Sequence, residues 1–156
     1  MATFKDYLEN NSPLILHGAL GTEMEALGYD ISGKLWSAKY LLEKPEIIQE
    51  IHETYIAAGA DLITTSSYQA TLPGLVEAGL TEKAAEQIIA LTVRLAKAAR
   101  DKVWVVLDET EKAKRPYPLI SGDVGPYAAY LANGSEYSGD YGQITIEELK
   151  EFHGDR

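Results

Sequence analysis

The residues best suited to chemistry in this chain lie in one short stretch near its N-terminus. An apolar run, residues 14–16, is followed by His17, by two glycines, Gly18 and Gly21, and by Thr22. An apolar run of this length bounded by glycine predicts a buried strand that ends in a sharp turn. Glycine lets a ligand come close to the backbone, and α/β folds build their sites just past such strand ends. We expect either a small-molecule site at this turn or a tight connection without a ligand.

A second stretch repeats this design further along the chain. The short apolar run Leu119–Ser121 is followed by Gly122, Gly125 and Pro126. Beyond it, residues 127–141 form a segment dense in Tyr, Gly, Ser and Asn, for which sugar binding and simple packing both remain open.

Metal-ligating and nucleophilic side chains are few. The sequence contains no cysteine, which excludes disulfides, a cysteine nucleophile and any thiolate metal site within it. A histidine metal site would have to combine His17, His52 and His153, but His52 lies inside a predicted helix and His153 lies near the chain end. We therefore expect structural histidines and no metal site. The sequence also lacks a phosphate-binding loop, a dinucleotide fingerprint and a nucleophile elbow.

Composition narrows the class of protein. The 156 residues carry a net charge of −10, which argues against nucleic acid and anionic membrane surfaces as partners. No run of 18 apolar residues is present, and the N-terminus lacks the apolar centre of a signal peptide. The chain is long enough for one domain with a sizeable core. We expect a single cytoplasmic domain over residues 1–156.

Helical spacing of apolar residues defines the elements that position these stretches. Helices are predicted at 4–9, as a single turn at 23–28, at Pro45–Ala58 and at 145–153, where Thr145 and Glu148 have capping-box spacing. Apolar residues recurring every three or four positions from Ile88 predict one long helix from Thr81 to about Asp108. The alternative is a helix ending near Arg100 and an extra strand at 103–107. Residues 112–118 are predicted to be a polar connection.

Strands alternate with these helices. Besides 14–16 and 119–121, residues Asp61–Thr65 are rich in β-favouring side chains. This order predicts an α/β fold with about three parallel strands joined by right-handed crossover helices. A complete eight-stranded barrel usually needs about 250 residues, so the chain is too short for one.

Six segments, in order along the chain, resemble the homocysteine S-methyltransferases that use S-methylmethionine or S-adenosylmethionine. They are Gly18-Ala-Leu-Gly-Thr-Glu23, Leu35-Trp-Ser-Ala-Lys39, Ala58-Gly-Ala-Asp61, Thr65-Ser-Ser-Tyr-Gln-Ala70, Val124-Gly-Pro-Tyr127 and Gly134-Ser-Glu-Tyr-Ser-Gly-Asp-Tyr141. The resemblance implies a partial (β/α)8 TIM barrel, the N-terminal half of such an enzyme.

The resemblance also implies a chemistry. In that family a zinc ion holds homocysteine as a thiolate, and the sulfur takes a methyl group from a sulfonium donor to give methionine. The zinc ligands are cysteines in Gly-x-Asn-Cys and Gly-Gly-Cys-Cys motifs, which this chain lacks. We therefore expect no cofactor in this chain and no activity of the chain alone.

Four residues carry over as substrate-binding candidates: Gly18 and Thr22 at the first turn, Tyr68 after the second strand and Gly125 after the third. Tyr137 and Tyr141 are further candidates for the donor's entrance. Two positions depart from the family, which usually has aspartate in place of His17 and often a small residue in place of Asp123. A neutral histidine is only a weak acceptor for the amino group that the aspartate would contact.

Two other functions are compatible with the sequence. One is a non-catalytic half-barrel that self-associates or pairs with a C-terminal partner chain, since three parallel strands leave open edges. The other is a small α/β protein that uses its glycine turns to bind an anion.

Overall fold

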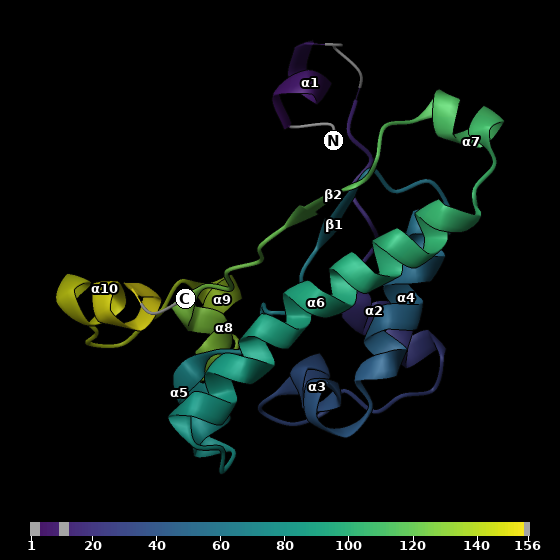
Figure 1. The fold of residues 1–156 in the computed structure, drawn as a ribbon. Helices are drawn as coiled ribbons and strands as arrows, with labels where there is room; N and C mark the ends of the chain where they lie inside the picture. The colour runs from purple at the N-terminus through teal and green to yellow at the C-terminus, as the bar shows by residue number, and fades with distance from the viewer. Residues whose placement is uncertain (1–3, 10–12, 155–156) are drawn as a thin grey trace.

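The computed structural model describes residues 4–9 and 13–154, and its ribbon is dominated by helices around a small sheet (Figure 1). In chain order the elements are α1 (Phe4–Glu9), α2 (Leu20–Ala26), η1 (Trp36–Lys39), α3 (Tyr40–Glu43), α4 (Pro45–Ala57), β1 (Leu62–Thr64), α5 (Leu72–Glu77), α6 (Glu82–Val106), α7 (Glu109–Lys114), β2 (Leu119–Ser121), α8 (Tyr127–Leu131), α9 (Ser135–Ser138) and α10 (Ile146–Gly154).

The described sheet has two parallel strands rather than three. β1 pairs with β2 in the register Leu62↔Leu119, Ile63↔Ile120 and Thr64↔Ser121. The predicted first strand forms only an isolated parallel bridge, Leu16↔Leu62. The three segments lie side by side and parallel, as expected, but the prediction of a third full strand is wrong.

Hydrogen bonding around Ile15 explains this difference. The Ile15 amide donates to the Asp61 carboxylate at 3.1 Å. The Ile15 carbonyl accepts from the amides of both Asp61 and Leu62, at 2.8 and 3.1 Å. The Ile15 amide is thus bonded to a side chain, and the Ile15 carbonyl serves two neighbouring amides instead of one. The regular pattern of backbone hydrogen bonds between residues 14–16 and β1 therefore does not extend.

Helices α4 and α6 pack against each other and carry the core. α6 is continuous from Glu82 to Val106, which confirms the long helix and makes the alternative strand at 103–107 wrong. Its periodic apolar face, which reaches Val103, explains why that β-favouring residue stays helical. One core cluster joins Ile56 and Ala60, at the end of α4, to Ile63 of β1 and to Ala96 and Ala99 of α6.

Short helices occupy segments that the sequence predicts to be loops. Asp108 accepts a hydrogen bond from the Glu111 amide at 2.8 Å and so caps α7, which replaces part of the predicted connection 112–118. Leu107 is extended, so Asp108 begins a new helix instead of ending α6. α5, α8 and α9 are further short helices in segments where the sequence predicts no helix. The capping box at Thr145 and Glu148 is confirmed.

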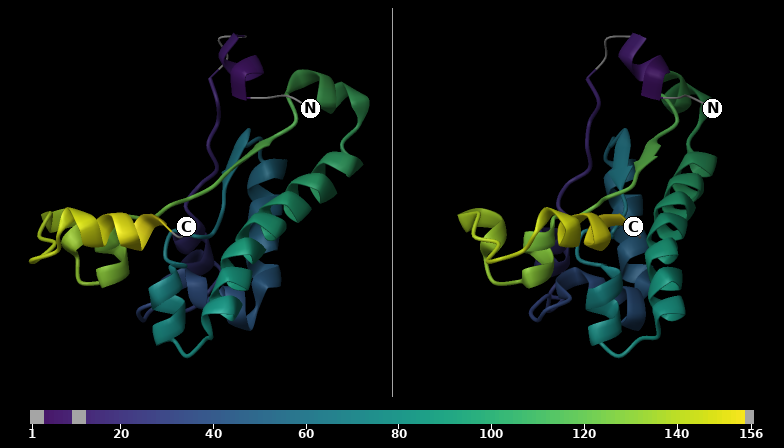
Figure 2. Two further views of the ribbon diagram at one scale, coloured as in Figure 1. Left: turned by 60° about the vertical axis from the view of Figure 1, so that its left-hand side comes forward. Right: turned by 90° about the vertical axis from the view of Figure 1, so that its left-hand side faces the viewer.

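The last three helices, α8 to α10, lie to one side of the α4 and α6 pair, whereas α1 lies beyond the sheet (Figure 2). Arg115 holds the segment that leads into β2 against the end of α4, because its guanidinium donates to the carbonyls of Ile56 and Ala60 at 2.8 and 2.6 Å. None of the described helices is long and apolar enough to cross a bilayer.

Candidate functional site

A cavity of about 790 Å³ lies at the glycine turn that follows the Leu16 bridge and at the ends of β1 and β2. Its lining comes from six separate segments of the chain. These residues are Leu16, His17, Gly18, Ala19, Leu20, Gly21, Thr22, Glu25, Ile31, Trp36, Ser37, His52, Thr64, Thr65, Ser66, Tyr68, Gln69, Asp123, Glu136 and Tyr137. We call this the strand-end cavity.

The structure brings three of the four predicted binding residues to this cavity. Gly18, Thr22 and Tyr68 line it, whereas Gly125 does not. Gly125 instead packs beneath Tyr68, where a Cβ atom would meet the Tyr68 carbonyl group. Its effect on the cavity is therefore through the position of the Tyr68 backbone. Whether these residues contact a substrate stays a prediction.

Two of the three histidines meet at the cavity. The rings of His17 and His52 are 5.8 Å apart, edge to face, and His17 Nε2 is 2.6 Å from Thr64 Oγ1. Burial lowers the pKa of His17, and burial together with the nearby His17 lowers the pKa of His52 to about 4. Both imidazoles are therefore neutral at pH 7. His153 lies elsewhere, against Phe152.

Buried polar atoms without a hydrogen-bond partner concentrate around the cavity. Within the described residues they are His17 Nδ1, both ring nitrogens of His52, Ser66 Oγ, Glu136 Oε2 and Arg115 Nε, and all but the last belong to cavity-lining residues. Buried polar groups in folded proteins are nearly always paired with protein or ordered water. These atoms therefore have hydrogen-bonding capacity left for water or for a ligand in the cavity.

The charges on the lining have one sign. Glu25, Asp123 and Glu136 line the cavity, and no Lys or Arg is among its described lining residues. Burial raises the pKa of Tyr68, and the carboxylates of Glu136 and Asp123 raise it further. This field favours a ligand that carries positive charge.

Hydrogen bonds hold the loop after β1 against the loop after β2. Ser67 Oγ donates to the Asp123 carbonyl at 2.6 Å, and the Asp123 amide donates to Thr65 Oγ1 at 2.9 Å. The two hydroxyls of Thr65 and Ser67 are themselves 2.7 Å apart. These contacts fix Asp123 beside the cavity.

The residues of this chain do not fit a zinc site of the thiolate kind. The sequence has no cysteine, and within residues 4–9 and 13–154 no three His, Cys, Asp or Glu side chains converge closely enough to hold a metal ion.

Several lining residues were not identified from the sequence. The sequence places His52 inside a predicted helix, and its position beside Ile48, Ile51 and Tyr55 is a signal of burial. Trp36 is 42% exposed at the cavity and has a left-handed backbone, φ +46°, which is rare for a bulky residue. Tyr137 lines the cavity, but Tyr141 lines a different one.

Comparison with known proteins gives consistent results. Residues 14–156 match the sequence model of the family described as homocysteine S-methyltransferase. The chain is 44% identical, over its full length, to homocysteine S-methyltransferase YbgG of Bacillus subtilis, covering 49% of that protein. It is 44% identical to homocysteine S-methyltransferase of Escherichia coli over 149 residues, covering 96% of this chain and 46% of the relative.

A solved structure agrees with these relatives. The metallated form of the homocysteine methyltransferase MmuM from Escherichia coli matches with a TM-score of 0.81 and 42% identity, over 95% of this chain and 50% of that one. The chain spans about half the length of the curated relatives it matches.

Proposed function

Because the chain belongs to the homocysteine S-methyltransferase family, we propose that it forms the N-terminal half of a barrel enzyme that methylates homocysteine to methionine. Residues 1–156 act in this proposal as one domain. The methyl donor is a sulfonium compound, S-methylmethionine or S-adenosylmethionine. The strand-end cavity is the chain's share of the substrate pocket, with Gly18, Thr22 and Tyr68 at its wall and Gly125 supporting Tyr68.

The concentration of unpaired buried polar atoms at this cavity carries the proposal. Homocysteine brings an ammonium group, a carboxylate and a thiol, and the sulfonium donor brings a second positive charge. The carboxylates of Glu25, Asp123 and Glu136 complement these cations, and Glu136 Oε2 is a buried acceptor without a partner among the described residues. The same acidic lining disfavours the alternative in which the glycine turns bind an anion.

His17 takes a specific part in this pocket. Its ring is held at Thr64 and stays neutral at pH 7, so it adds no positive charge that would repel an ammonium group. If Nε2 carries the proton that Thr64 accepts, Nδ1 is left as an acceptor. A neutral acceptor is weaker than a carboxylate, which predicts weak homocysteine binding.

We expect the 156-residue chain to show no methyl transfer by itself, because it has no side chains that fit the zinc ion of the family. Homocysteine, S-methylmethionine and zinc are incubated with the chain, and methionine is measured. The expected amount equals that of a control without protein. Methionine above that control would contradict the expected inactivity.

A binding measurement tests the pocket separately from turnover. Trp36 lines the cavity, and Trp104, the only other tryptophan in the sequence, packs on Tyr117. In a Trp104→Phe variant, homocysteine should change Trp36 fluorescence, and Tyr68→Leu should weaken that response by about tenfold, as expected for a lost wall residue. No response up to millimolar homocysteine would overturn the pocket assignment.

A second candidate function is that of a non-catalytic half-barrel covered by another chain. Ile15, Leu16 and Val124 are each 57% exposed near the sheet, and within the described residues no strand pairs with the outer edge of β2. Exposed apolar side chains beside an open edge favour association, either with a second copy or with a chain supplying the C-terminal half.

This association predicts an oligomer of the isolated chain. Light scattering should give a mass at least twice 17.1 kDa, and a Leu16→Lys substitution should shift the mass towards that of a monomer. The matched control is Leu27→Lys, since Leu27 is equally exposed, at 57%, just after the end of α2. A dispersed monomer at all concentrations would contradict self-association.

A further inference from the structure

The connection between α8 and α9, residues 132–134, contains the only Asn-Gly pair of the sequence, Asn133-Gly134. An asparagine followed by glycine is chemically reactive, because the next backbone nitrogen can attack the side-chain carbonyl carbon and close a cyclic imide. Glycine has no Cβ atom to obstruct that attack. All three residues of the connection are exposed, so water reaches them.

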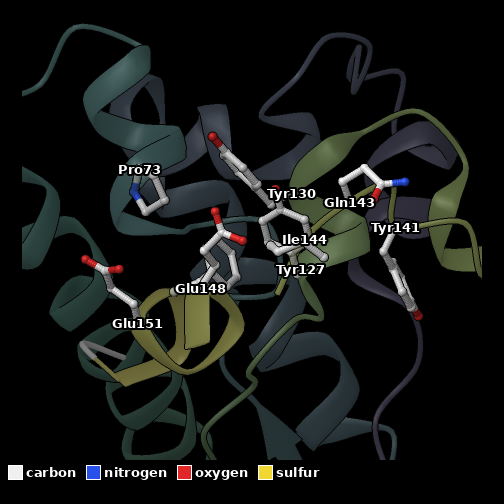
Figure 3. Close-up of a pocket in the computed structure, with 9 residues that line it drawn as sticks. Pro73, Tyr127, Tyr130, Tyr141, Gln143, Ile144, Glu148 and Glu151 are labelled. Carbon is white, nitrogen blue, oxygen red and sulfur yellow. The ribbon is translucent and has the colours of Figure 1, made fainter. Parts of the chain in front are cut away.

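Aromatic packing holds α8 in place without covering this connection. The rings of Tyr127 and Tyr130 have centroids 5.1 and 5.3 Å from that of Phe152 in α10. Together with residues of α10 they line a cavity of about 560 Å³, in which Figure 3 shows both tyrosines. Within the described part of the chain, residues 132–134 line neither this cavity nor the strand-end cavity. The connection therefore projects from a fixed helix into solvent.

The Gly134 amide is available as a nucleophile. Among the residues that the structure describes, no acceptor takes its N–H. The φ angle of Gly134 is +84°, and no heavy atom beyond its chain neighbours lies within 4 Å of the place where a Cβ would be. Neither a hydrogen bond nor a neighbouring side chain therefore prevents the nitrogen from losing its proton and approaching Asn133.

The side chain of Asn133 is held as the electrophile. Its Oδ1 accepts a hydrogen bond from the Ser135 backbone amide at 3.0 Å and a second one from the Ser135 hydroxyl. When the Gly134 nitrogen bonds to Cγ, negative charge develops on this same oxygen, and donors already aimed at it lower the barrier. Ser135 is only 4% exposed, so water does not readily replace these donors.

We propose that Asn133 is a site of spontaneous covalent modification, at which the Gly134 amide closes an imide that water opens to isoaspartate. The Gly134 nitrogen bonds to Cγ, the Cγ–Nδ2 bond breaks, and ammonia leaves with the proton of the Gly134 N–H. Water then adds to one imide carbonyl to give aspartate, or to the other to give isoaspartate, in which the backbone runs through the side chain. Water is the only co-reactant.

This conversion also changes the strand-end cavity. It adds a negative charge, lengthens the backbone between α8 and α9, and moves the acceptor that holds Ser135. Glu136 and Tyr137 follow directly in α9, and both line the strand-end cavity. A shift of α9 therefore displaces these two side chains.

The first experiment locates the reaction and identifies its products. The 156-residue chain is incubated at neutral and at mildly alkaline pH, and its tryptic peptides are analysed by mass spectrometry. Asn133 should gain about 1 Da and yield both aspartate and isoaspartate. The reaction should be faster at the higher pH, because the attacking nitrogen must lose its proton. Asn10 and Asn11, neither of which precedes glycine, serve as internal controls and should stay unchanged.

A substitution at Ser135 tests the part played by the fold. Ser135→Ala removes the hydroxyl donor and keeps the backbone amide, so the reaction should become about tenfold slower. In concentrated urea, where no donor is positioned, the variant and the wild type should react at equal rates.

The effect on the cavity is measured without any ligand. Amide NMR shifts of fresh and aged chain should differ at residues 136–137 and 65–69. Asn133→Ser is the matched control, because its hydroxyl can still accept from the Ser135 amide but cannot form an imide. Its spectrum should not change with age.

Four results would contradict these expectations. Aspartate as the sole product, equal rates at all three asparagines, or a folded Ser135→Ala chain that reacts as fast as the wild type or faster would overturn the modification site. Shifts confined to residues 131–135 would overturn its effect on the cavity. None of these measurements uses homocysteine, so their outcome is independent of the proposed function.

Discussion

Replacing Gly125 by alanine is expected to lower the free energy of unfolding by about 3 kcal/mol. An added Cβ would collide with the carbonyl oxygen of Tyr68 and lie 2.9 Å from its carbonyl carbon and 3.3 Å from its Cα. These are backbone atoms, so no change of side-chain rotamer relieves the contact. The two loops would have to separate. Urea denaturation of the variant and the wild type measures the difference.

Gly122 provides the matched control in the same loop. A Cβ at Gly122 would meet nothing within 4 Å, and neither glycine has a positive φ. Gly122→Ala should therefore change stability by about 0.5 kcal/mol or less. Equal unfolding midpoints for the two variants would contradict the close packing of Gly125 on Tyr68. The Gly125 variant should also lose the Trp36 response to homocysteine, because Tyr68 would move.

The chain is expected to lose about 2 kcal/mol of stability between pH 7 and pH 5 through His52. In the folded protein burial and His17 lower the pKa of His52 to about 4, whereas in the unfolded chain it is about 6.5. The unfolded state therefore binds more protons between these two values. Stability contributed by the neutral imidazole is present above pH 6.5 and is lost as the pH falls towards 4.

Other titrating groups act differently in this window. The pKa of Asp30 is lowered to about 2 by Ser32 and Lys39, so its contribution is lost only at more acid pH. Burial lowers the pKa of His17, so His17 adds a pH dependence of stability with the same sign as that of His52. His52→Leu should remove the His52 part of the slope. It also removes two unpaired buried nitrogens, so its stability at pH 7 should change by about 1 kcal/mol or less. Parallel pH profiles for variant and wild type would exclude His52 as the cause.

The long helices were predicted well from the sequence because their apolar residues recur at helical spacing. The apolar residues from Ile88 to Val103 turn one face of α6 towards α4, and packing of that face, Val103 included, keeps the segment helical against its β preference. Val105 and Val106, at the very end, are 73% and 78% exposed. The prediction of a full strand at residues 14–16 was wrong for a reason that local residue preferences do not reveal. The partner of the Ile15 amide is a side chain 46 residues away, Asp61.

The cavity was predicted only in part. The glycine turn and Tyr68 are visible as local patterns, because each follows an apolar run. His52 and Glu136 reach the cavity from α4 and α9, which are far from the glycine turn along the chain, so no local pattern marks them. The meeting of Tyr127 and Phe152 depends likewise on the return of α10 towards α8.

The parallel pairing of β1 with β2 has a consequence for the order of folding. Thr65 and Asp123, which join the two strand ends, are 58 positions apart in the chain. Closing so large a loop from the random coil costs entropy, whereas α6 shortens the distance once it has formed and packed on α4. We infer that the helical pair assembles early and that the sheet, together with the strand-end cavity, is a late product of the folding reaction.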